Sequence, residues 1–84
     1  MIKQLFSLKD KLAGFSDPFV DVNGPICMRH IRNSLKQETD FSMNPKDFEL
    51  FQLGSFNTDD GTFTSDIKKL IDVADLIEVV DANA

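Results

Sequence analysis

Basic side chains at helical spacing are the first feature of this sequence that could do chemistry. Arg29, Arg32 and Lys36 stand at i, i+3 and i+7. At about 100° per residue they fall within an arc of about 60° on one side of a helix. Such a stripe can contact nucleic-acid phosphates, and Lys9 and Lys11 are candidates to lie beside it. The alternative, which the residue types alone favour, is a solvated helix face that pairs with acidic residues elsewhere in the chain.

Phenylalanines are the second such feature, because aromatic rings can stack on unpaired bases. Residues 44–56 have the sequence NPKDFELFQLGSF and contain Phe48, Phe51 and Phe56. The chain has eight phenylalanines but no tyrosine or tryptophan, so phenylalanine is the only aromatic residue from which its core can be built. We therefore interpret these three as core residues rather than as a stacking platform.

Groups that support catalysis or metal binding are sparse. His30 is the only histidine, and the sequence indicates no nucleophile–base pair around it. Cys27 is the only cysteine, and one cysteine with one histidine cannot supply the nitrogen and sulfur ligands of a usual metal site. The acidic run NTDDGTFTSD lacks the spacing of a calcium loop, which favours a hairpin turn instead. We expect no enzyme activity, no cofactor and no bound metal.

Length and charge limit the remaining possibilities. The 84 residues predict a single domain, 1–84, whose thin stability margin leads us to expect at least a dimer. The net charge of −5 argues against strong sequence-independent DNA binding, yet residues 1–36 carry +3 and residues 37–84 carry −8. The single thiol fits a reducing compartment, and no apolar run reaches the length of about 18 residues that a membrane span needs. We expect a soluble intracellular protein without a membrane partner.

Apolar periodicity and turn signals predict the elements that must position these residues. Residues 2–8 alternate as a strand. Asn23 as N-cap and Pro25 in the first turn predict a helix over about 24–37, which carries the basic stripe. Residues 48–56 are predicted to pair with 62–65 across an Asp-Gly turn. The result is an α+β fold, in which the 24–37 helix covers one face of a small antiparallel sheet.

The C-terminal segment is predicted to be a helix over 66–76, because its apolar residues recur at i, i+3, i+4 and i+7. Residues 77–80 fit helix or strand. The segment 66–84 is a candidate oligomerisation or partner-docking tail, with these interface residues: Leu70, Ile71, Ala74 and Ile77. A place in the core explains the same four residues equally well.

The central block of the chain resembles a viral family. It matches the pattern Pro-x-Asp-Phe-x-Leu-x-x-Leu-Gly-x-Phe, followed by a turn that ends in glycine. The matching residues are Pro45, Asp47, Phe48, Leu50, Leu53, Gly54, Phe56 and Gly61, with an earlier Pro-Phe step at Pro18 and Phe19. In this the chain is similar to the small nonstructural protein of gokushoviruses, members of the Microviridae with single-stranded DNA genomes that infect bacteria. The resemblance covers most of residues 1–65.

The resemblance implies a nonstructural DNA-binding protein that acts in viral DNA synthesis or single-strand packaging, in the cytoplasm of an infected bacterium. Our first hypothesis is therefore an accessory protein that contacts single-stranded DNA weakly through its basic residues and gains avidity as a homo-oligomer. Our second hypothesis is an acidic interaction module. It would dock on a viral or host replication protein through residues 66–81 and bind no nucleic acid.

Overall fold

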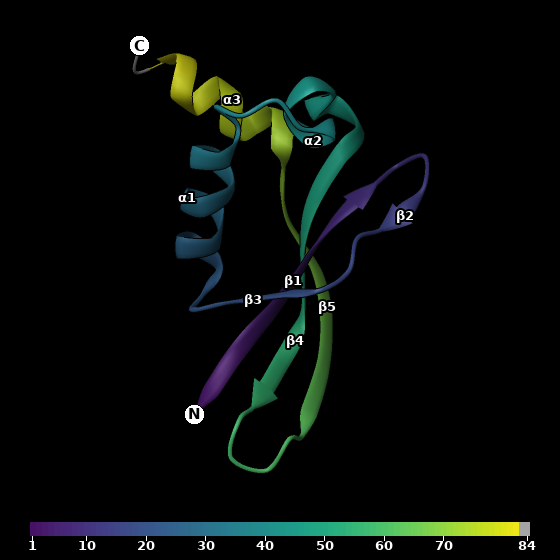
Figure 1. The fold of residues 1–84 in the computed structure, drawn as a ribbon, viewed down its shortest axis with the longest axis vertical. Helices are drawn as coiled ribbons and strands as arrows, with labels where there is room; N and C mark the ends of the chain where they lie inside the picture. Colours follow the sequence, from purple (N-terminus) through teal and green to yellow (C-terminus); the bar gives the residue numbers. More distant parts are fainter. Residues whose placement is uncertain (83–84) are drawn as a thin grey trace.

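The computed structural model is an antiparallel sheet with helices beside it and at one end (Figure 1). It describes the backbone of residues 1–82 and the side chains of residues 1–77. The strands are β1 (Ile2–Asp10), β2 (Gly14–Phe15), β3 (Phe19–Asp21), β4 (Phe48–Asn57) and β5 (Phe63–Asp72). The helices are α1 (Gly24–Ser34), α2 (Asp40–Met43), the short 3-10 helix η1 (Pro45–Asp47) and α3 (Val73–Ala82).

The five strands follow the order β2-β1-β4-β5, and β3 also pairs with β1. Both β2 and β3 lie on the outer side of β1, where β2 meets its C-terminal end and β3 its middle. The predicted α+β class and the hairpin of 48–56 with 62–65 are confirmed, and both hairpin strands run further than predicted. β5 forms the opposite edge of the sheet.

Helix α1 begins where its capping residues predict. The Asn23 side chain accepts a hydrogen bond of 2.9 Å from the Ile26 amide, and Pro25 lies in the first turn, where its missing N–H is not needed. The helix ends at Ser34, three residues before the predicted end at 37. The amides of Lys36 and Gln37 bond back three residues, to Asn33 and Ser34, so the chain tightens into a turn. Lys36 therefore lies just outside α1.

The hydrophobic core lies on one face of the sheet. Phe6 and Leu50 contribute from the sheet, Cys27 and Ile31 from α1, and Leu76 from α3. The prediction that Phe48, Phe51 and Phe56 build this core was wrong, because the structure leaves all three half-buried and outside the cluster. Leu50 takes the inward position on β4, so strand alternation turns Phe51 to the other face, and the register places Phe56 there as well. Phe48 shares the face of Leu50 but lies at the start of β4, where its ring centroid is 6.4 Å from that of Phe41.

The C-terminal prediction was wrong over residues 66–72, which continue β5 as a strand, and helix α3 begins only at Val73. The segment 77–80, for which helix and strand both remained open, lies within α3. The predicted interface residues are therefore divided between two elements. Leu70 and Ile71 lie on β5 and pack against the core, whereas Ala74 and Ile77 lie half-buried on α3.

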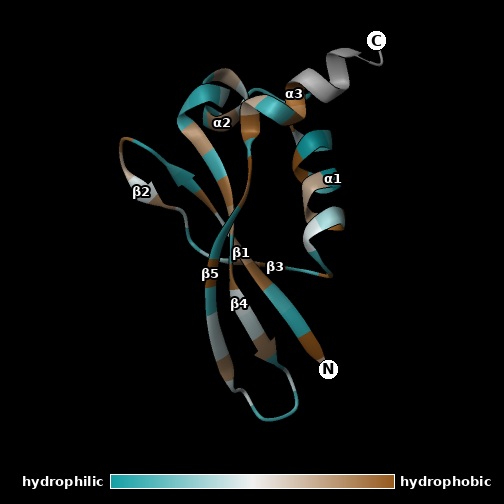
Figure 2. Cartoon of the chain, turned by 180° about the vertical axis from the view of Figure 1, so that it is seen from behind, coloured by the Kyte–Doolittle hydropathy of each residue, from teal (hydrophilic) through white to brown (hydrophobic). Residues whose placement is uncertain are grey.

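The molecule is elongated, with principal extents of 43 × 28 × 20 Å. Figures 1 and 2 show α2 and α3 at one end and α1 alongside the sheet, while the chain's N-terminus and the turn of the β4–β5 hairpin lie at the other end. The Met1 amino group ties the two together through a 3.0 Å contact with Asp59. Within the described residues, no helix is long and apolar enough to cross a membrane.

Candidate nucleic-acid interface

The structure separates the five basic residues that were candidates for phosphate contact. Arg29 and Arg32 lie on α1, which packs on the core face of the sheet through Cys27 and Ile31. Lys36 follows the end of that helix. Lys9 lies near the end of β1, on the face opposite to Phe6 and Leu8. The basic residues of the helix and Lys9 thus occupy different faces of the sheet and do not line one groove.

Lys11 lies in the loop after β1 and is engaged by the adjacent chain. Its ammonium group donates a 2.9 Å hydrogen bond to the Lys46 carbonyl, and its amide donates to the Asp47 carbonyl at 2.8 Å. Because both bonds hold the loop against η1, we assign Lys11 a structural role in joining these segments.

The second face of the sheet carries the side chains that combine aromatic rings with positive charge. Directly paired residues of neighbouring strands share a face, so the strand register identifies its members. We call it the open face, and its members include Lys3, Leu5, Lys9, Phe15, Val20, Phe51, Phe56 and Phe63. The core residues that α1 and α3 contribute within the described chain all pack on the other side. Phe15, Val20 and Phe63 are 49, 49 and 51 % exposed, so this face presents apolar side chains to solvent.

Phe15, Phe51 and Lys9 form a cluster on the open face. The two rings meet edge to face, with centroids 5.1 Å apart and planes at 80°. The Lys9 ammonium nitrogen lies 5.5 Å from the Phe15 centroid and 5.7 Å from the Phe51 centroid, which is within cation–π range. The cluster offers both an aromatic surface for a base and a cation for a phosphate.

Hydrogen bonds beneath this cluster hold its elements in register. Ser7 is fully buried on β1, and its hydroxyl donates to the Ser16 carbonyl at 2.8 Å. The Ser16 hydroxyl oxygen accepts a 3.0 Å bond from the Leu8 amide. Ser16 thereby ties the link between β2 and β3 to β1. These bonds keep Phe15 beside Lys9.

Glu49, the cross-strand partner of Lys9, is engaged by another lysine. Lys69 contacts Glu49 at 2.9 Å and Asp72 at 2.8 Å. The hydrogen bonds with Asp72 and then Glu49 raise the pKa of Lys69, and the hydrogen bond from Lys69 lowers the pKa of Asp72. In the part of the chain with described side chains, neither Lys9 nor Lys3 forms a salt bridge. Their positive charges therefore remain available to a ligand.

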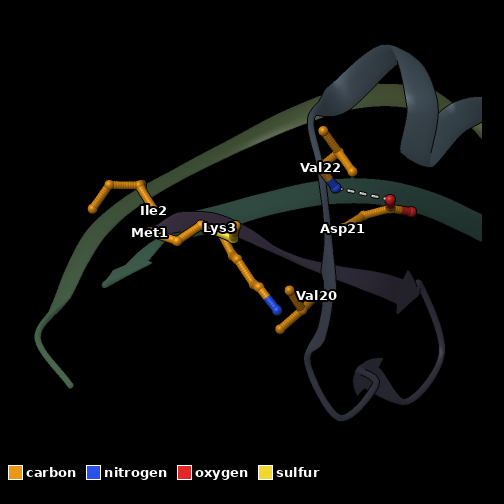
Figure 3. Close-up of a pocket in the computed structure, with 6 residues that line it drawn as sticks. All are labelled: Met1, Ile2, Lys3, Val20, Asp21 and Val22. Atoms are coloured by element: carbon orange, nitrogen blue, oxygen red, sulfur yellow. Dashed lines mark hydrogen bonds between the residues drawn. The ribbon is translucent and has the colours of Figure 1, made fainter. Parts of the chain in front are cut away.

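A hollow of about 520 Å³ opens beside Lys3, at the outer edge of β1 (Figure 3). It exists because β3 pairs only with residues 4–6 and leaves the start of β1 uncovered. Its lining is formed by Met1, Ile2, Lys3, Val20, Asp21 and Val22. Figure 3 shows the Lys3 side chain extending toward Val20. The hollow is mainly apolar, and Lys3 gives it one positive charge.

The remaining reactive groups are held in structural contacts. His30 is exposed on α1, and its Nδ1 lies 2.7 Å from the Asp21 carboxylate, which links the helix to β3. Cys27 is fully buried in the core. Burial, with a smaller contribution from the charge of Asp21, raises the pKa of Cys27 to about 12. This thiol is therefore protonated and unreactive in the folded protein.

Sequence reasoning identified Lys9 but missed Phe15, Phe63 and Lys3 as candidate binding residues. One signal was available, since the alternation of residues 2–8 places Lys3 opposite to Phe6 and Leu8. The position of Phe15 next to Lys9 depends instead on the pairing of β1 with β2, which two residues of strand cannot predict. Whether Phe63 is exposed and can bind a ligand depends on which face of the sheet the helices cover.

Comparison with known proteins identifies a family to which the chain is similar. The model of the family described as Phage ORF5 protein matches residues 3–79, which is nearly the whole chain. No curated protein matches the chain, and no solved structure does. The matched range includes all but the first residue of β1, the complete β4–β5 hairpin and most of α3. The chain therefore belongs to the Phage ORF5 protein family and is a bacteriophage protein.

Proposed function

We propose that this phage protein binds single-stranded DNA weakly through the open face of its sheet, as a nonstructural accessory protein of genome replication or packaging. The observation that carries the proposal is the position of Lys9 over the rings of Phe15 and Phe51, at 5.5 and 5.7 Å, on a face that the core does not use. The infected bacterium's cytoplasm is where such a protein would meet its DNA. Membership of a phage family and the resemblance to gokushovirus proteins support this role.

Stacking is the main source of affinity in this proposal. A base stacked on an aromatic side chain contributes about 1–3 kcal/mol, whatever its sequence, and a neighbouring lysine adds a phosphate contact. The net charge of −5 opposes any polyanion, so few phosphates can contribute. If Lys3 and Lys9 make two such contacts, the logarithm of affinity falls with the logarithm of salt concentration with a slope of about −1.4. Binding by one chain is weak, and a homo-oligomer multiplies it.

The experiment compares two charge-matched variants that lie on different faces. Fluorescence anisotropy follows a labelled oligothymidylate of about 12 nucleotides at low and physiological salt. We expect Lys9→Glu to weaken binding by about tenfold, since it removes the cation over the rings and repels phosphate. Arg29→Glu introduces the same charge change on α1. It is expected to cause only the small loss that the extra negative charge produces.

Two outcomes decide between the candidate surfaces. A loss confined to the α1 variant would move the site to the predicted stripe of Arg29, Arg32 and Lys36. An absence of binding at low salt, with every variant folded, would refute DNA binding altogether. The acidic interaction module would then be the better hypothesis. One observation favours docking on a protein: residues 63–69 of β5, although not acidic, are exposed along the sheet edge, with Ile67 63 % exposed.

The oligomeric state belongs to the same proposal. Leu70 and Ile71 already contribute to the chain's own core, so α3 is the better candidate for the interface, through Ala74 and Ile77. Light scattering gives the molar mass, and Ile77→Glu is expected to lower it to that of one chain. An unchanged oligomer would place the interface elsewhere.

A further inference from the structure

A second row of aromatic and basic side chains lies at the other end of the open face. Lys3, Phe56 and Phe63 are direct cross-strand partners on β1, β4 and β5 and therefore lie side by side. Phe63 is 51 % exposed, and Lys3 is also exposed. This row repeats the combination of ring and cation found at Lys9 and Phe15.

The backbone beneath Phe63 holds its ring in place. A Cβ atom built on Gly54 would lie 3.0 Å from the tip of that ring, so the ring rests on the glycine with no side chain between them. Gly54 is directly paired with Leu5, which belongs to the same face. A ring that is held by its own sheet loses little freedom when a base stacks on it. Phe63 is thus a preformed platform whose outer surface is free to take a base.

Lys3 connects this row to the hollow at the edge of β1. It lines the hollow together with Val20, which is 49 % exposed on the open face. The hollow has a volume of about 520 Å³, which is within the range of small-molecule sites. The end of the open face therefore offers a ring, a cation and an apolar recess in succession.

We infer that the row of Lys3 and Phe63 is a second contact point for the same DNA strand. This inference rests on the proposed function. Lys3 and Lys9 are six residues apart on one strand, a distance of about 20 Å at the rise of a β-strand. About six nucleotides span that distance when their bases stay stacked at 3.4 Å, and an extended strand needs fewer. Ser7 lies between Lys3 and Lys9 on this face and is fully buried, with its hydroxyl bonded to Ser16. A strand that follows β1 and crosses the link between β2 and β3 at Ser16 can therefore reach both ends of the open face, whereas a very short oligonucleotide reaches only one.

Oligonucleotide length provides the test. We compare oligothymidylates of about 4 and about 12 nucleotides on the wild type, Phe15→Ala and Phe63→Ala, with Met43→Ala as the control. Met43 is 66 % exposed on α2 and lies outside both rows. Phe63→Ala is expected to weaken the long oligonucleotide by about 5- to 150-fold, the range for one stacked base. The short oligonucleotide still binds this variant at Phe15. The long oligonucleotide therefore no longer binds more tightly than the short one, and this advantage of length is lost.

The outcomes separate this inference from the proposed function. If Phe15→Ala weakens binding and Phe63→Ala behaves like Met43→Ala, the second contact point is refuted while the first stands. If neither Phe15→Ala nor Phe63→Ala weakens DNA binding, both proposals fail. If Phe63→Ala halves the molar mass in light scattering and DNA binding is absent, the open face is an interface between chains and the inference is overturned. Lys3→Gln repeats the test at an exposed position, in case Phe63→Ala does not fold, and a length advantage equal to that of the wild type would refute the inference.

Discussion

Replacing Gly54 with alanine tests how closely β4 and β5 approach each other beneath Phe63. Gly54 has a φ of +154°, and a Cβ atom at this position would lie 2.0 Å from the Thr64 carbonyl oxygen. The unfavourable φ alone costs an alanine about 1–3 kcal/mol, of which about 0.4–1 is recovered because the unfolded chain is less flexible. To clear the oxygen, the two strands must also separate near the pair of Gly54 with Ser65. Losing one or two ladder hydrogen bonds adds about 1 kcal/mol each.

The expected destabilisation by Gly54→Ala is therefore about 3 kcal/mol. Gly61→Ala is the matched control, because Gly61 has a φ of +76° but nothing within 4 Å of its added Cβ. It is expected to cost only about 1 kcal/mol, from the backbone conformation alone. Urea unfolding followed by circular dichroism measures both values. A variant that is unfolded without urea also meets the expectation, since small domains have thin margins. If Gly54→Ala costs no more than Gly61→Ala, the close contact with Thr64 does not exist.

Two further predictions concern titratable groups. The Cys27 thiol, with its pKa raised to about 12 by burial, is expected to react with iodoacetamide at about pH 8 only as fast as the protein unfolds, and rapid labelling without denaturant would contradict its burial. Lys69 holds the pKa of Asp72 below 3.8, so the stability from this pair is present above 3.8 and is lost as pH falls through the lowered value. The pKa of Lys69 is raised above 10.5 by Asp72 and then Glu49, so its contribution is complete below 10.5 and is lost as pH rises through the raised value. Lys69→Met is expected to be less stable than wild type at neutral pH, with the difference shrinking in acid; an unchanged difference in urea midpoints would refute this.

Local signals in the sequence predicted those elements whose ends depend on their own residues. Helix α1 begins at a side-chain cap by Asn23, which acts within three residues, and the β4–β5 hairpin turns at Gly61, where φ is positive. The end of α1 was less predictable. Residues 35–37 keep apparent helical character in the sequence, but bonds to the third preceding residue close the helix early.

Bulges explain why the start of the C-terminal segment was predicted as helix. Leu50 and Phe51 of β4 face Ile71 and Lys69, so Leu70 is an extra residue on β5. The next step, from Gln52 to Gly54, spans three residues of β5. These insertions break the alternation of a strand and leave apolar residues at 67, 70 and 71, a spacing typical of a helix. The register against β4, which no local pattern contains, decides between the two structures.

The candidate site was less predictable than the fold, because the residues that form it are determined by which face of the sheet stays uncovered. Both faces of β4 carry apolar residues, and the sequence offered no reason to place Leu50 inward rather than Phe51. Once α1 docks on Phe6 and Leu50, the register requires Phe51, Phe15 and Lys9 to share the other face. Long-range packing thus turned residues of ordinary core type into an exposed surface.

The acidic balance of the chain and a DNA-binding face are compatible once the range of each force is considered. Repulsion from the net charge of −5 acts through water and salt, and at physiological ionic strength it decays over about 8 Å. Stacking on Phe15 or Phe63 acts at contact and does not depend on salt. Lys9 is attracted to phosphate at close range, while the Glu49 carboxylate next to it is occupied by Lys69. If the proposed face binds DNA, it would hold a strand loosely and release it easily, as the proposed accessory role requires.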